Sequence, residues 1–412
     1  MKNNPIRLLV LVSAFARNKN DSGDFTLDLS LLLKKNGLDM TVLCPSDCNL
    51  KRQENIKGLD VYRFAYFYPQ SIQRLAYGAG MPENLKTSFL AKIQVPFFIL
   101  SELIAAIRLI RYKKINVIQS HWLIPQGLVG SICQKYYHIP HVATIHSSEV
   151  TILRKLPLGK KLTEFILLNS TRIISVSHHR FEELMAFISP EVAKKIREKT
   201  DFIPMGIAMN SFSRRFSKKS LLANNNLSPT ILFVGRLVEV KGVNYLIRAF
   251  PLIQRKFKLA KLLIVGDGPL KQELKELAVK LKIHDKVQFL GFIDHRKMAD
   301  FYNLSDVTVF PSIIDASGYQ EGMPVVLLEA LSSRNIVVAA DTPGVREVIE
   351  DGINGYLAKQ KNSQDLAQKI ILALENNNSK VMKIEARKTV QMFDWGKVAR
   401  KYSEVIENAN FK

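Results

Sequence analysis

The chain has 412 residues, which is too long for one ordinary domain, so we expect two. Its composition, 47% hydrophobic and 23% charged, is that of a globular protein. The net charge of +22 favours anionic partners, such as nucleic acid, acidic phospholipid or a phosphorylated substrate, without choosing among them.

Short apolar runs alternate with helical patterns along the first half of the chain. The apolar run 8–12 follows the first residues directly and predicts a strand in place of a signal peptide. Strands are predicted at 6–12, 39–43, 116–120, 141–145, 172–176 and 201–203, and helices at 24–36 and 125–137.

The same alternation returns after a polar break within 204–229. Strands are predicted at 230–234, 261–265, 287–290, 306–310 and 336–340, and helices at 243–257, 269–281 and 324–331. Short apolar strands between helices indicate parallel sheets covered on both faces. Two such series predict two doubly wound, Rossmann-like α/β domains, with the active site in a cleft where they face each other.

Two glutamates in the second half flank a short turn and an apolar run. Glu321 and Glu329 have seven residues between them, and Pro324 predicts a helix beginning there. The free amides and positive end of that helix suit a phosphate, and the carboxylates suit hydroxyls of a sugar or ribose. The alternative is an ordinary helix start with two solvated glutamates.

Two cations follow the predicted strand 230–234. Arg236 and Lys241 lie five residues apart between Gly235 and Gly242, just before a helix. A guanidinium can form two hydrogen bonds to a phosphate group, and an ammonium supplies a point charge. Together they could neutralise a departing diphosphate without a metal. The alternative is two solvated surface cations.

The first half offers a glycine and two histidines. Gly23 opens the helix 24–36 and permits close approach of a diphosphate, unless it is a plain N-cap turn. His121 and His146 each lie at or just after a predicted strand end, which favours a pair lining a cleft. The chain has no Asp-x-Asp, no Gly-x-Gly-x-x-Gly and no Walker-type motif, so paired aspartates on a divalent cation are not expected.

These motifs, in this order, resemble the retaining GT-B glycosyltransferases of glycosyltransferase family 4. The likeness covers nearly the whole chain and is strongest from 231 to 355, where Glu321 and Glu329 match the paired-glutamate motif of the family. The other matching stretches are 310–312, 343–347 and 351–355 in the second half, and Gly23, 120–127, His146 and 203–206 in the first.

The resemblance implies a role for each matching position in the second domain. Arg236 and Lys241 are expected to bind the donor diphosphate and stabilise it as it leaves. Glu329 is expected to hold the nucleotide ribose, and Glu321 to contact the donor sugar near its anomeric carbon. The donor is then a nucleotide-diphosphate sugar of the UDP or GDP type, with no separate cofactor and no metal.

In the first domain, the resemblance implies that Gly23 lets a loop close over the phosphates and that His146 lines the acceptor side. The implied domains are 1–205 for the acceptor, 206–390 for the nucleotide sugar, and a C-terminal helix within 391–412 that packs back toward the first domain. Further residues expected at the substrate are Gly235, Gly322, Met323, Val325, Val326 and His121.

The chain departs from the family pattern in three places. Asp24 follows Gly23, where the family often has a second glycine, and 146–149 reads His-Ser-Ser-Glu in place of His-Gly-Ser-Asp. Ala208 stands where an aspartate often follows the linker. The first two departures concern first-domain contacts, and none touches the donor site.

The segment 62–114 combines aromatic, apolar and basic residues. Such a mixture suits the surface of an anionic membrane, or else a core helix with a solvated basic end. Its apolar stretch 95–110 contains Pro96, Glu102 and Arg108 and is shorter than the roughly 20 residues of a spanning helix, so no transmembrane helix is expected. We expect a cytoplasmic enzyme, peripheral on the membrane, with a saccharide or lipid-linked acceptor.

Two other functions compete with transfer to a polysaccharide or glycolipid acceptor. A nucleic-acid-binding protein would account for the charge of +22, but the basic residues are spread along the chain and no recognition motif occurs, so no nucleic-acid partner is expected. A GT-B nucleotide-sugar epimerase would act on the donor alone. Product analysis without an acceptor separates it from a transferase.

Overall fold

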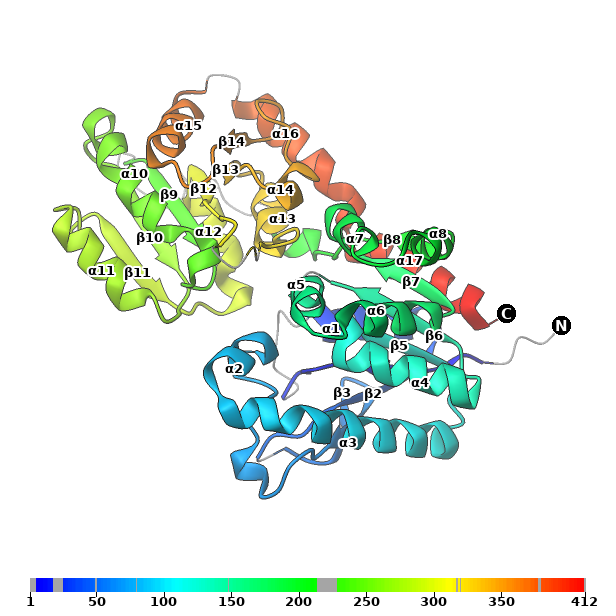
Figure 1. The fold of residues 1–412 in the computed structure, drawn as a ribbon. Helices are drawn as coiled ribbons and strands as arrows, with labels where there is room; N and C mark the ends of the chain where they lie inside the picture. The colour runs from blue at the N-terminus through cyan, green and yellow to red at the C-terminus, as the bar shows by residue number, and fades with distance from the viewer. Residues whose placement is uncertain are drawn as a thin grey trace. The chain divides into compact units, whose positions relative to one another are not determined.

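The computed structural model describes residues 5–17, 25–48, 50–78, 80–146, 148–212, 228–315, 318, 320–376 and 379–410. The chain divides into two compact units, Met1–Met205 with Trp395–Lys412 (unit 1) and Gly206–Asp394 (unit 2). Each unit has a central sheet with helices on both faces (Figure 1). The prediction of two Rossmann-like α/β domains is therefore confirmed.

The described part of unit 1 holds an eight-stranded sheet with the order β3-β4-β2-β1-β5-β6-β7-β8. Neighbouring strands are parallel except β3 and β4, which are antiparallel. The strands are β1 (Arg7–Leu11), β2 (Asp39–Pro45), β3 (Gln53–Ile56), β4 (Leu59–Phe64), β5 (Val117–His121), β6 (His141–Ile145), β7 (Arg172–Ser175) and β8 (Thr200–Phe202).

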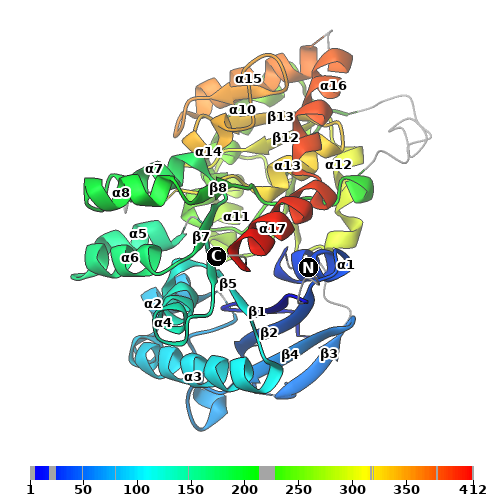
Figure 2. The same cartoon turned by 90° about the vertical axis from the view of Figure 1, so that its right-hand side faces the viewer.

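Helices cover both faces of this sheet, as Figures 1 and 2 show. Leu8 and Val10 of β1 point to the face packed by α1 and α17, whereas Leu9 and Leu11 point to the face packed by α3 and α4. The strands are apolar throughout because both faces are buried. The helices are α1 (Phe25–Lys35), α2 (Met81–Thr87), α3 (Phe89–Lys113), α4 (Leu128–Tyr137), α5 (Ser148–Lys155), α6 (Gly159–Leu168), α7 (His178–Met185), α8 (Pro190–Arg197) and α17 (Trp395–Asn410), with short turns η1 (Gln70–Ile72) and η2 (Leu123–Gly127).

The hairpin β3–β4 is absent from the sequence-based prediction, which expected parallel strands throughout. Its outer strand is short and mostly polar, so it lacks the apolar run by which the other strands were found. The amide of Gly58 donates to Asn55 Oδ1 at 2.8 Å and closes the turn. The hairpin therefore depends on local turn chemistry, and β3 forms an edge of the sheet.

The helix α3 is longer than the sequence indicated. It spans 25 residues with Pro96 inside, and by length and composition alone it could cross a membrane. The argument that the apolar stretch is too short is therefore wrong. In the structure, one side of α3 is buried in unit 1, including Phe98, Glu102 and Ala106.

Unit 2 holds, among its described residues, a parallel sheet with the order β11-β10-β9-β12-β13-β14. One face is packed by α10, α11 and α15, and the other by α12, α13 and α16. The strands are β9 (Thr230–Val234), β10 (Lys261–Val265), β11 (Val287–Gly291), β12 (Val307–Phe310), β13 (Ile336–Ala340) and β14 (Tyr356–Ala358). The helices are α10 (Val243–Lys256), α11 (Lys271–Lys280), α12 (Met298–Leu304), α13 (Val325–Ser332), α14 (Pro343–Arg346), α15 (Ser363–Glu375) and α16 (Ser379–Thr389), with turns η3 (Met209–Phe212), η4 (Glu239–Lys241), η5 (His295–Lys297) and η6 (Val390–Phe393).

Candidate functional site

The predicted residues of unit 2 gather where the order of its sheet reverses. Strand β9 lies between β10 and β12, so the chain leaves β9 toward one side and later returns to the other. In open parallel sheets, ligands bind outside the carboxyl ends of the strands at such a point. The loop after β9 carries Arg236 and Lys241, and the segment after β12 carries Ser312 and Glu321.

Lys241 and Glu321 form an ion pair. The ammonium Nζ of Lys241 lies 2.5 Å from Glu321 Oε1, and both side chains are largely buried. The hydroxyl of Ser312 donates to the other oxygen of Glu321 at 2.9 Å. A cation and a carboxylate that are 80 residues apart in sequence are thus brought together by the loops after β9 and β12.

Gly242 makes this approach possible. It adopts φ of 61°, which side chains disfavour, and a Cβ on it would lie only 2.0 Å from the carbonyl oxygen of Pro311. The turn that carries Lys241 therefore presses directly on the backbone that follows β12. Any larger residue would push the two loops, and with them Lys241 and Glu321, apart.

Arg236 differs from Lys241 in its environment. Its side chain is exposed, and its guanidinium forms no ion pair with any residue that the structure describes. Arg236 follows Gly235, which lies next to Lys241: a Cβ added to Gly235 would be 3.4 Å from Lys241 Cε. The carboxyl edge of β9 thus carries one cation held by a carboxylate and one that is accessible to an anion.

The helix α13 begins one residue later than predicted. Pro324 has an extended conformation and precedes the helix instead of lying in its first turn. The backbone amides of Val325 and Val326 bond no residue in the described part of the chain. Gly322 packs closely against Gly344, because a Cβ added to Gly344 would lie 2.1 Å from the carbonyl oxygen of Gly322. Met323 packs on the adjoining core.

Glu329 is buried in unit 2, with only 4% of its surface exposed. His295 Nε2 donates to its Oε1 at 2.9 Å, and the hydroxyl of Tyr302 donates to its Oε2 at 3.0 Å. Burial, and then the negative charge of Glu329, raise the pKa of Tyr302 well above its ordinary value, so Tyr302 stays a donor. The interpretation of Glu329 as a solvated helix residue is therefore wrong.

Sequence reasoning missed His295 and Tyr302. His295 lies in η5 and Tyr302 in α12, 34 and 27 residues before Glu329. Neither belongs to a motif with Glu329, and although His295 lies four residues after the end of β11, nothing in that spacing points to Glu329. Only the packing of η5 and α12 against α13 joins these side chains, so the sequence carried no signal for them.

The predicted histidines of unit 1 are in contact. A hydrogen bond of 3.2 Å joins His121 Nδ1 to His146 Nε2, and both rings are buried. Their ring centroids lie 5.4 Å apart, and Phe25 and Trp122 complete a four-ring cluster with them. The two predicted histidines are therefore neighbours, and the expectation that they line a cleft stays a prediction.

Both histidines are neutral at ordinary pH. Burial lowers the pKa of His121 to about 3, and burial together with the neighbouring His121 lowers the pKa of His146 well below its ordinary value. Neutral imidazoles can accept or donate a hydrogen bond but bring no positive charge to the site. This environment argues against a protonated histidine as an acid.

Glu149, which the sequence singled out only as a departure from the family pattern, also belongs to this cluster. It is 1% exposed, and its Oε1 accepts from the backbone amide of His146 at 2.6 Å. Burial raises the pKa of Glu149 to about 7, against the lowering effect of nearby backbone amides and Arg180. A carboxyl group that titrates near neutrality therefore adjoins His146.

Trp122 is held in a strained backbone conformation. Its φ of 69° and ψ of 146° are rare for any residue with a side chain, and its ring lies 4.8 Å from that of His146. Strain of this kind gathers at functional sites, where the surrounding structure maintains it. Gly23, the other predicted residue of unit 1, lies outside the described residues.

No group of three or more His, Cys, Asp or Glu side chains within the described residues is placed to hold a metal ion. The expectation of a metal-free reaction remains a prediction. Among the groups predicted from the sequence, those of unit 2 that could stabilise a negative charge are Arg236, Lys241 and the start of α13.

Comparison with protein families gives one match for each half of the chain. Residues 23–208 match the model of Glycosyltransferase Family 4, and residues 214–389 match that of Glycosyl transferases group 1. An uncharacterised glycosyltransferase of Methanocaldococcus jannaschii is 27% identical over 387 residues, which cover 92% of this chain and 91% of that protein.

Two further proteins are similar over different extents. The phosphatidyl-myo-inositol mannosyltransferase of Mycobacterium leprae is 33% identical over 207 residues, which cover 50% of this chain and 52% of that protein. The Anabaena protein HepE, solved in complex with UDP, superposes with a TM-score of 0.72 at 17% identity, covering 98% of this chain and 100% of HepE. The structural likeness confirms the two-domain fold expected above.

Proposed function

Since the chain belongs to the glycosyltransferases of the Family 4 and group 1 type, we propose that it transfers a sugar from a nucleotide-diphosphate donor to a hydroxyl acceptor with retention of anomeric configuration. The donor binds to unit 2 and the acceptor to unit 1. The product belongs to a cell-surface polysaccharide or a glycolipid.

The observation that carries this proposal is the ion pair of Lys241 and Glu321 beside the accessible Arg236. When the glycosidic bond to the donor breaks, negative charge grows on the diphosphate. Fixed cations aimed at that charge lower the barrier, and removing one such donor typically costs on the order of 10²–10³ in rate. Glu321 holds the Lys241 ammonium in place before the donor arrives, so little reorganisation is needed.

The same carboxylate faces the sugar. Glu321 uses one oxygen for Lys241 and the other for Ser312, yet each carboxylate oxygen has a second acceptor site. It can therefore accept from a sugar hydroxyl while it keeps both partners. A negative charge there also stabilises the positive charge that develops on the anomeric carbon.

Glu329 is suited to the nucleotide ribose. Two donors, His295 and Tyr302, already fix its orientation, and its remaining acceptor sites can take the ribose hydroxyls. The amides of Val325 and Val326 at the start of α13 suit the phosphates. HepE was solved with UDP, which supports a UDP sugar as the first donor to test.

The acceptor side has different chemistry. His146 and His121 are neutral and form one hydrogen-bonded pair, so they position hydroxyls rather than supply a charge. In the retaining reaction proposed, the acceptor attacks the face from which the diphosphate leaves, and a diphosphate oxygen takes the acceptor proton. The cations of unit 2 complete this reaction without a metal ion.

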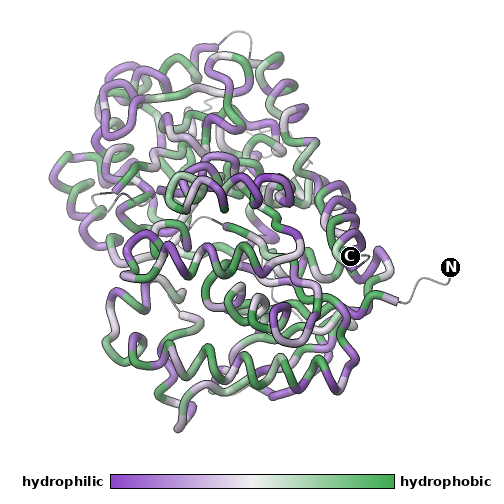
Figure 3. The backbone as a smooth tube through the Cα atoms, turned by 45° about the vertical axis from the view of Figure 1, so that its right-hand side comes forward, coloured by the Kyte–Doolittle hydropathy of each residue, from purple (hydrophilic) through white to green (hydrophobic). Residues whose placement is uncertain are grey.

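We place the enzyme at an anionic membrane surface, where a lipid-linked acceptor would be found. The helix α3 exposes Phe89, Ile93, Phe97 and Leu100, and basic residues follow at its C-terminal end. Figure 3 shows hydrophobic residues along the length of this helix. The mycobacterial relative is a phosphatidyl-myo-inositol mannosyltransferase, and a lipid-bearing acceptor for this chain agrees with that relationship.

The test is a donor screen followed by product analysis. Purified protein is melted with UDP, GDP and ADP sugars, and the donor that raises the melting temperature most is incubated with glycoside acceptors. We expect a product whose anomeric proton coupling matches that of the donor, in EDTA as well as in magnesium. An inverted product, a strict need for a divalent ion, or no response to any sugar nucleotide contradicts the proposal.

A further inference from the structure

Unit 1 contains a cavity of about 760 Å³ that the proposed donor chemistry does not use. It lies at the carboxyl ends of β1 and β5, between which the strand order of this sheet reverses. Ser13 follows β1, and Trp122 follows β5, and both line the cavity. The cavity thus occupies the position at which doubly wound sheets bind ligands, and its volume lies in the range of small-molecule sites.

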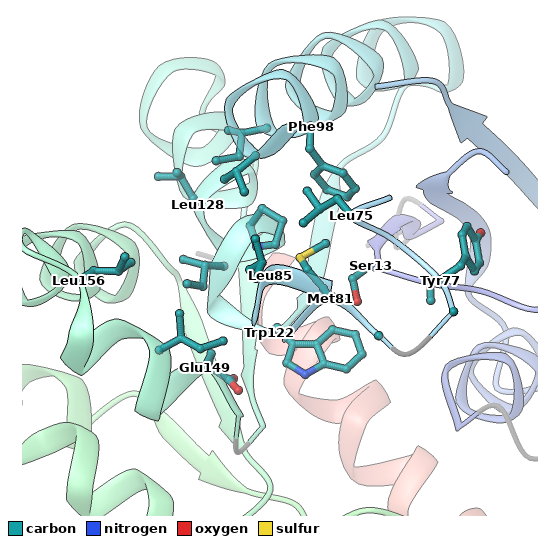
Figure 4. Close-up of a pocket in the computed structure, with 18 of the residues that line it drawn as sticks. Ser13, Leu75, Tyr77, Met81, Leu85, Phe98, Trp122, Leu128, Glu149 and Leu156 are labelled. Carbon is teal, nitrogen blue, oxygen red and sulfur yellow. The ribbon is translucent and has the colours of Figure 1, made fainter. Parts of the chain in front are cut away.

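Most of the cavity wall is apolar. Helices α2 and α3 supply Met81, Leu85, Val95, Phe98 and Ile99. Figure 4 shows Phe98 and Leu128 toward one edge of the view and Trp122 and Glu149 toward the opposite edge. A wall of this kind favours a hydrocarbon and offers few partners to a sugar, whose hydroxyls would lose their hydrogen bonds to water there.

One end of the cavity carries an unsatisfied polar group. Glu149 lines the cavity, and its Oε2 is buried without a hydrogen-bond partner among the described residues, whereas Oε1 accepts from the His146 amide. A buried acceptor of this kind is stabilised by a donor, which a ligand hydroxyl can supply. The Trp122 ring links this end to His146 at a centroid distance of 4.8 Å.

The outer side of α3 continues the apolar surface of the cavity. Val95, Phe98 and Ile99 line the cavity, while Phe89 and Phe97 on the same helix are 77% and 49% exposed. Phe97 contacts Phe67 edge to face with a centroid distance of 5.4 Å. Apolar side chains therefore run from the protein surface to the cavity along one helix, as is needed for a ligand drawn from a membrane.

We propose that this cavity binds the aliphatic chain of a lipid-type acceptor, with the reacting hydroxyl at the end lined by Glu149 and Trp122, next to His146. The inference rests on the proposed transferase function and names the class of its acceptor. The hydroxyl donates to Glu149 Oε2, and the aliphatic chain of the acceptor extends along Leu85 and Phe98. The length of this aliphatic chain then determines affinity, because each buried methylene strengthens binding by about fourfold.

Binding is tested without turnover by tryptophan fluorescence. The chain has two tryptophans, so Trp395→Phe leaves Trp122 in the cavity as the reporter. This protein is titrated with octyl β-D-glucoside below its critical micelle concentration and with methyl β-D-glucoside. We expect a saturable change with the octyl compound and none over the same range with the methyl compound. Equal responses to both would overturn the proposal.

Two isoleucine variants form a matched pair for this test. Ile99 lines the cavity and Ile384 is exposed on α16 of unit 2, so Ile99→Glu and Ile384→Glu make the same chemical change in different places. We expect Ile99→Glu to weaken octyl glucoside binding at least tenfold and Ile384→Glu to leave it within twofold. Circular dichroism and melting curves confirm that both variants are folded, and equal effects of the two contradict the assignment.

Transfer kinetics separate a failure of this inference from a failure of the proposed function. With the donor selected above, kcat/KM for octyl glucoside is expected to exceed that for methyl glucoside at least 100-fold, mostly through KM. Transfer to both acceptors at similar kcat/KM would leave the transferase standing and exclude a chain-binding cavity. Saturable octyl binding without transfer to any acceptor would keep the cavity assignment and reject the proposed function.

Discussion

The contact between Lys241 and Glu321 is the residue-level feature on which the proposed donor chemistry depends. Either side chain alone would be common at the edge of a sheet, whereas the pair is partly withdrawn from water and held by Ser312. Less exposure to solvent strengthens the field of the ammonium at a neighbouring phosphate. In the proposed reaction, the electrostatic work is divided between Lys241, a cation held by Glu321, and Arg236, an exposed one.

Removing the fixed cation is expected to slow transfer on the order of 10²–10³, because the leaving diphosphate loses one preorganised partner. Lys241→Ala is compared with Lys369→Ala, which removes another partly buried lysine of unit 2 that pairs with a carboxylate, Asp351. Steady-state rates and melting curves are measured for both. Comparable rates in the two variants would show that Lys241 has no special role, and melting should be nearly unchanged in each.

A second residue-level prediction concerns His295, which orients Glu329 and contacts no reacting atom in our proposal. A hydrogen bond to a charged group contributes about 1.5–3 kcal/mol, so His295→Ala should raise KM for the donor by about 10–100-fold. Because the loss concerns ribose binding in both ground and transition states, kcat should change little.

The control is His284→Ala, which alters another histidine of unit 2 outside this contact. His295→Gln, whose amide can still donate to Glu329, should restore part of the affinity. A large fall in kcat with unchanged KM would instead mean that His295 acts on the chemical step.

At the level of elements, the sequence predicted the buried strands well because each is a short apolar run with both faces covered. The sequence-based prediction failed where strand pairing or packing on the sheet determined the structure. The hairpin strand β3 is polar and held by pairing with β4, and α3 continues through Pro96 and Glu102 because its buried side packs on the sheet. In α3, such tertiary support outweighs local propensity.

The candidate site shows the same division. Arg236, Lys241 and Glu321 could be named from motifs because they lie in segments that follow strands, and Glu329 because it pairs with Glu321 in one motif. Their partners could not, since Ser312, His295 and Tyr302 become neighbours only through folding. Sequence therefore indicates which groups are candidates for the chemistry, and structure shows what orients them.

The carboxyl group of Glu102 is buried on the side of α3 that packs against the core of unit 1. Burial raises its pKa well above the ordinary value, and the amide of Gln126 opposes this effect only in part. A raised folded-state pKa means that its contribution to stability is present below the pKa of the unfolded chain and is lost as the pH rises toward the folded value. The native protein should therefore lose stability through this group between mildly acid and neutral pH.

Glu102→Gln removes the ionisable proton and should raise the melting temperature at pH 8 more than at pH 5. A shift of about 2–4 °C corresponds to each kcal/mol gained in a domain of this size. Glu404→Gln on the exposed side of α17 is the control and should give the same small change at both pH values. An equal shift for Glu102→Gln at the two pH values would contradict the buried, titrating carboxyl.

At the scale of the whole molecule, charge and apolar surface act together. In the proposed membrane binding, the net charge of +22 supplies attraction to anionic lipid, and the exposed aromatic side chains of α3 supply the short-range contact. The first effect is screened by salt and the second is not, because the Debye length falls from about 10 Å at 0.1 M to about 3 Å at 1 M. The two can therefore be separated in one experiment.

Sedimentation with vesicles of phosphatidylcholine and phosphatidylglycerol should show strong binding at 0.05 M salt and at least tenfold weaker binding at 0.5 M, because each basic residue near the surface contributes about 1 kcal/mol when unscreened. Pure phosphatidylcholine should bind little at either salt concentration. The double variant Phe89→Ser and Phe97→Ser should bind anionic vesicles more weakly at both salt concentrations. Phe292→Ser, which removes an exposed phenylalanine of unit 2, should behave as the unmodified protein does. Binding that does not change with salt would contradict the role of the net charge. An equal loss of binding in the Phe292 variant would contradict the role of α3.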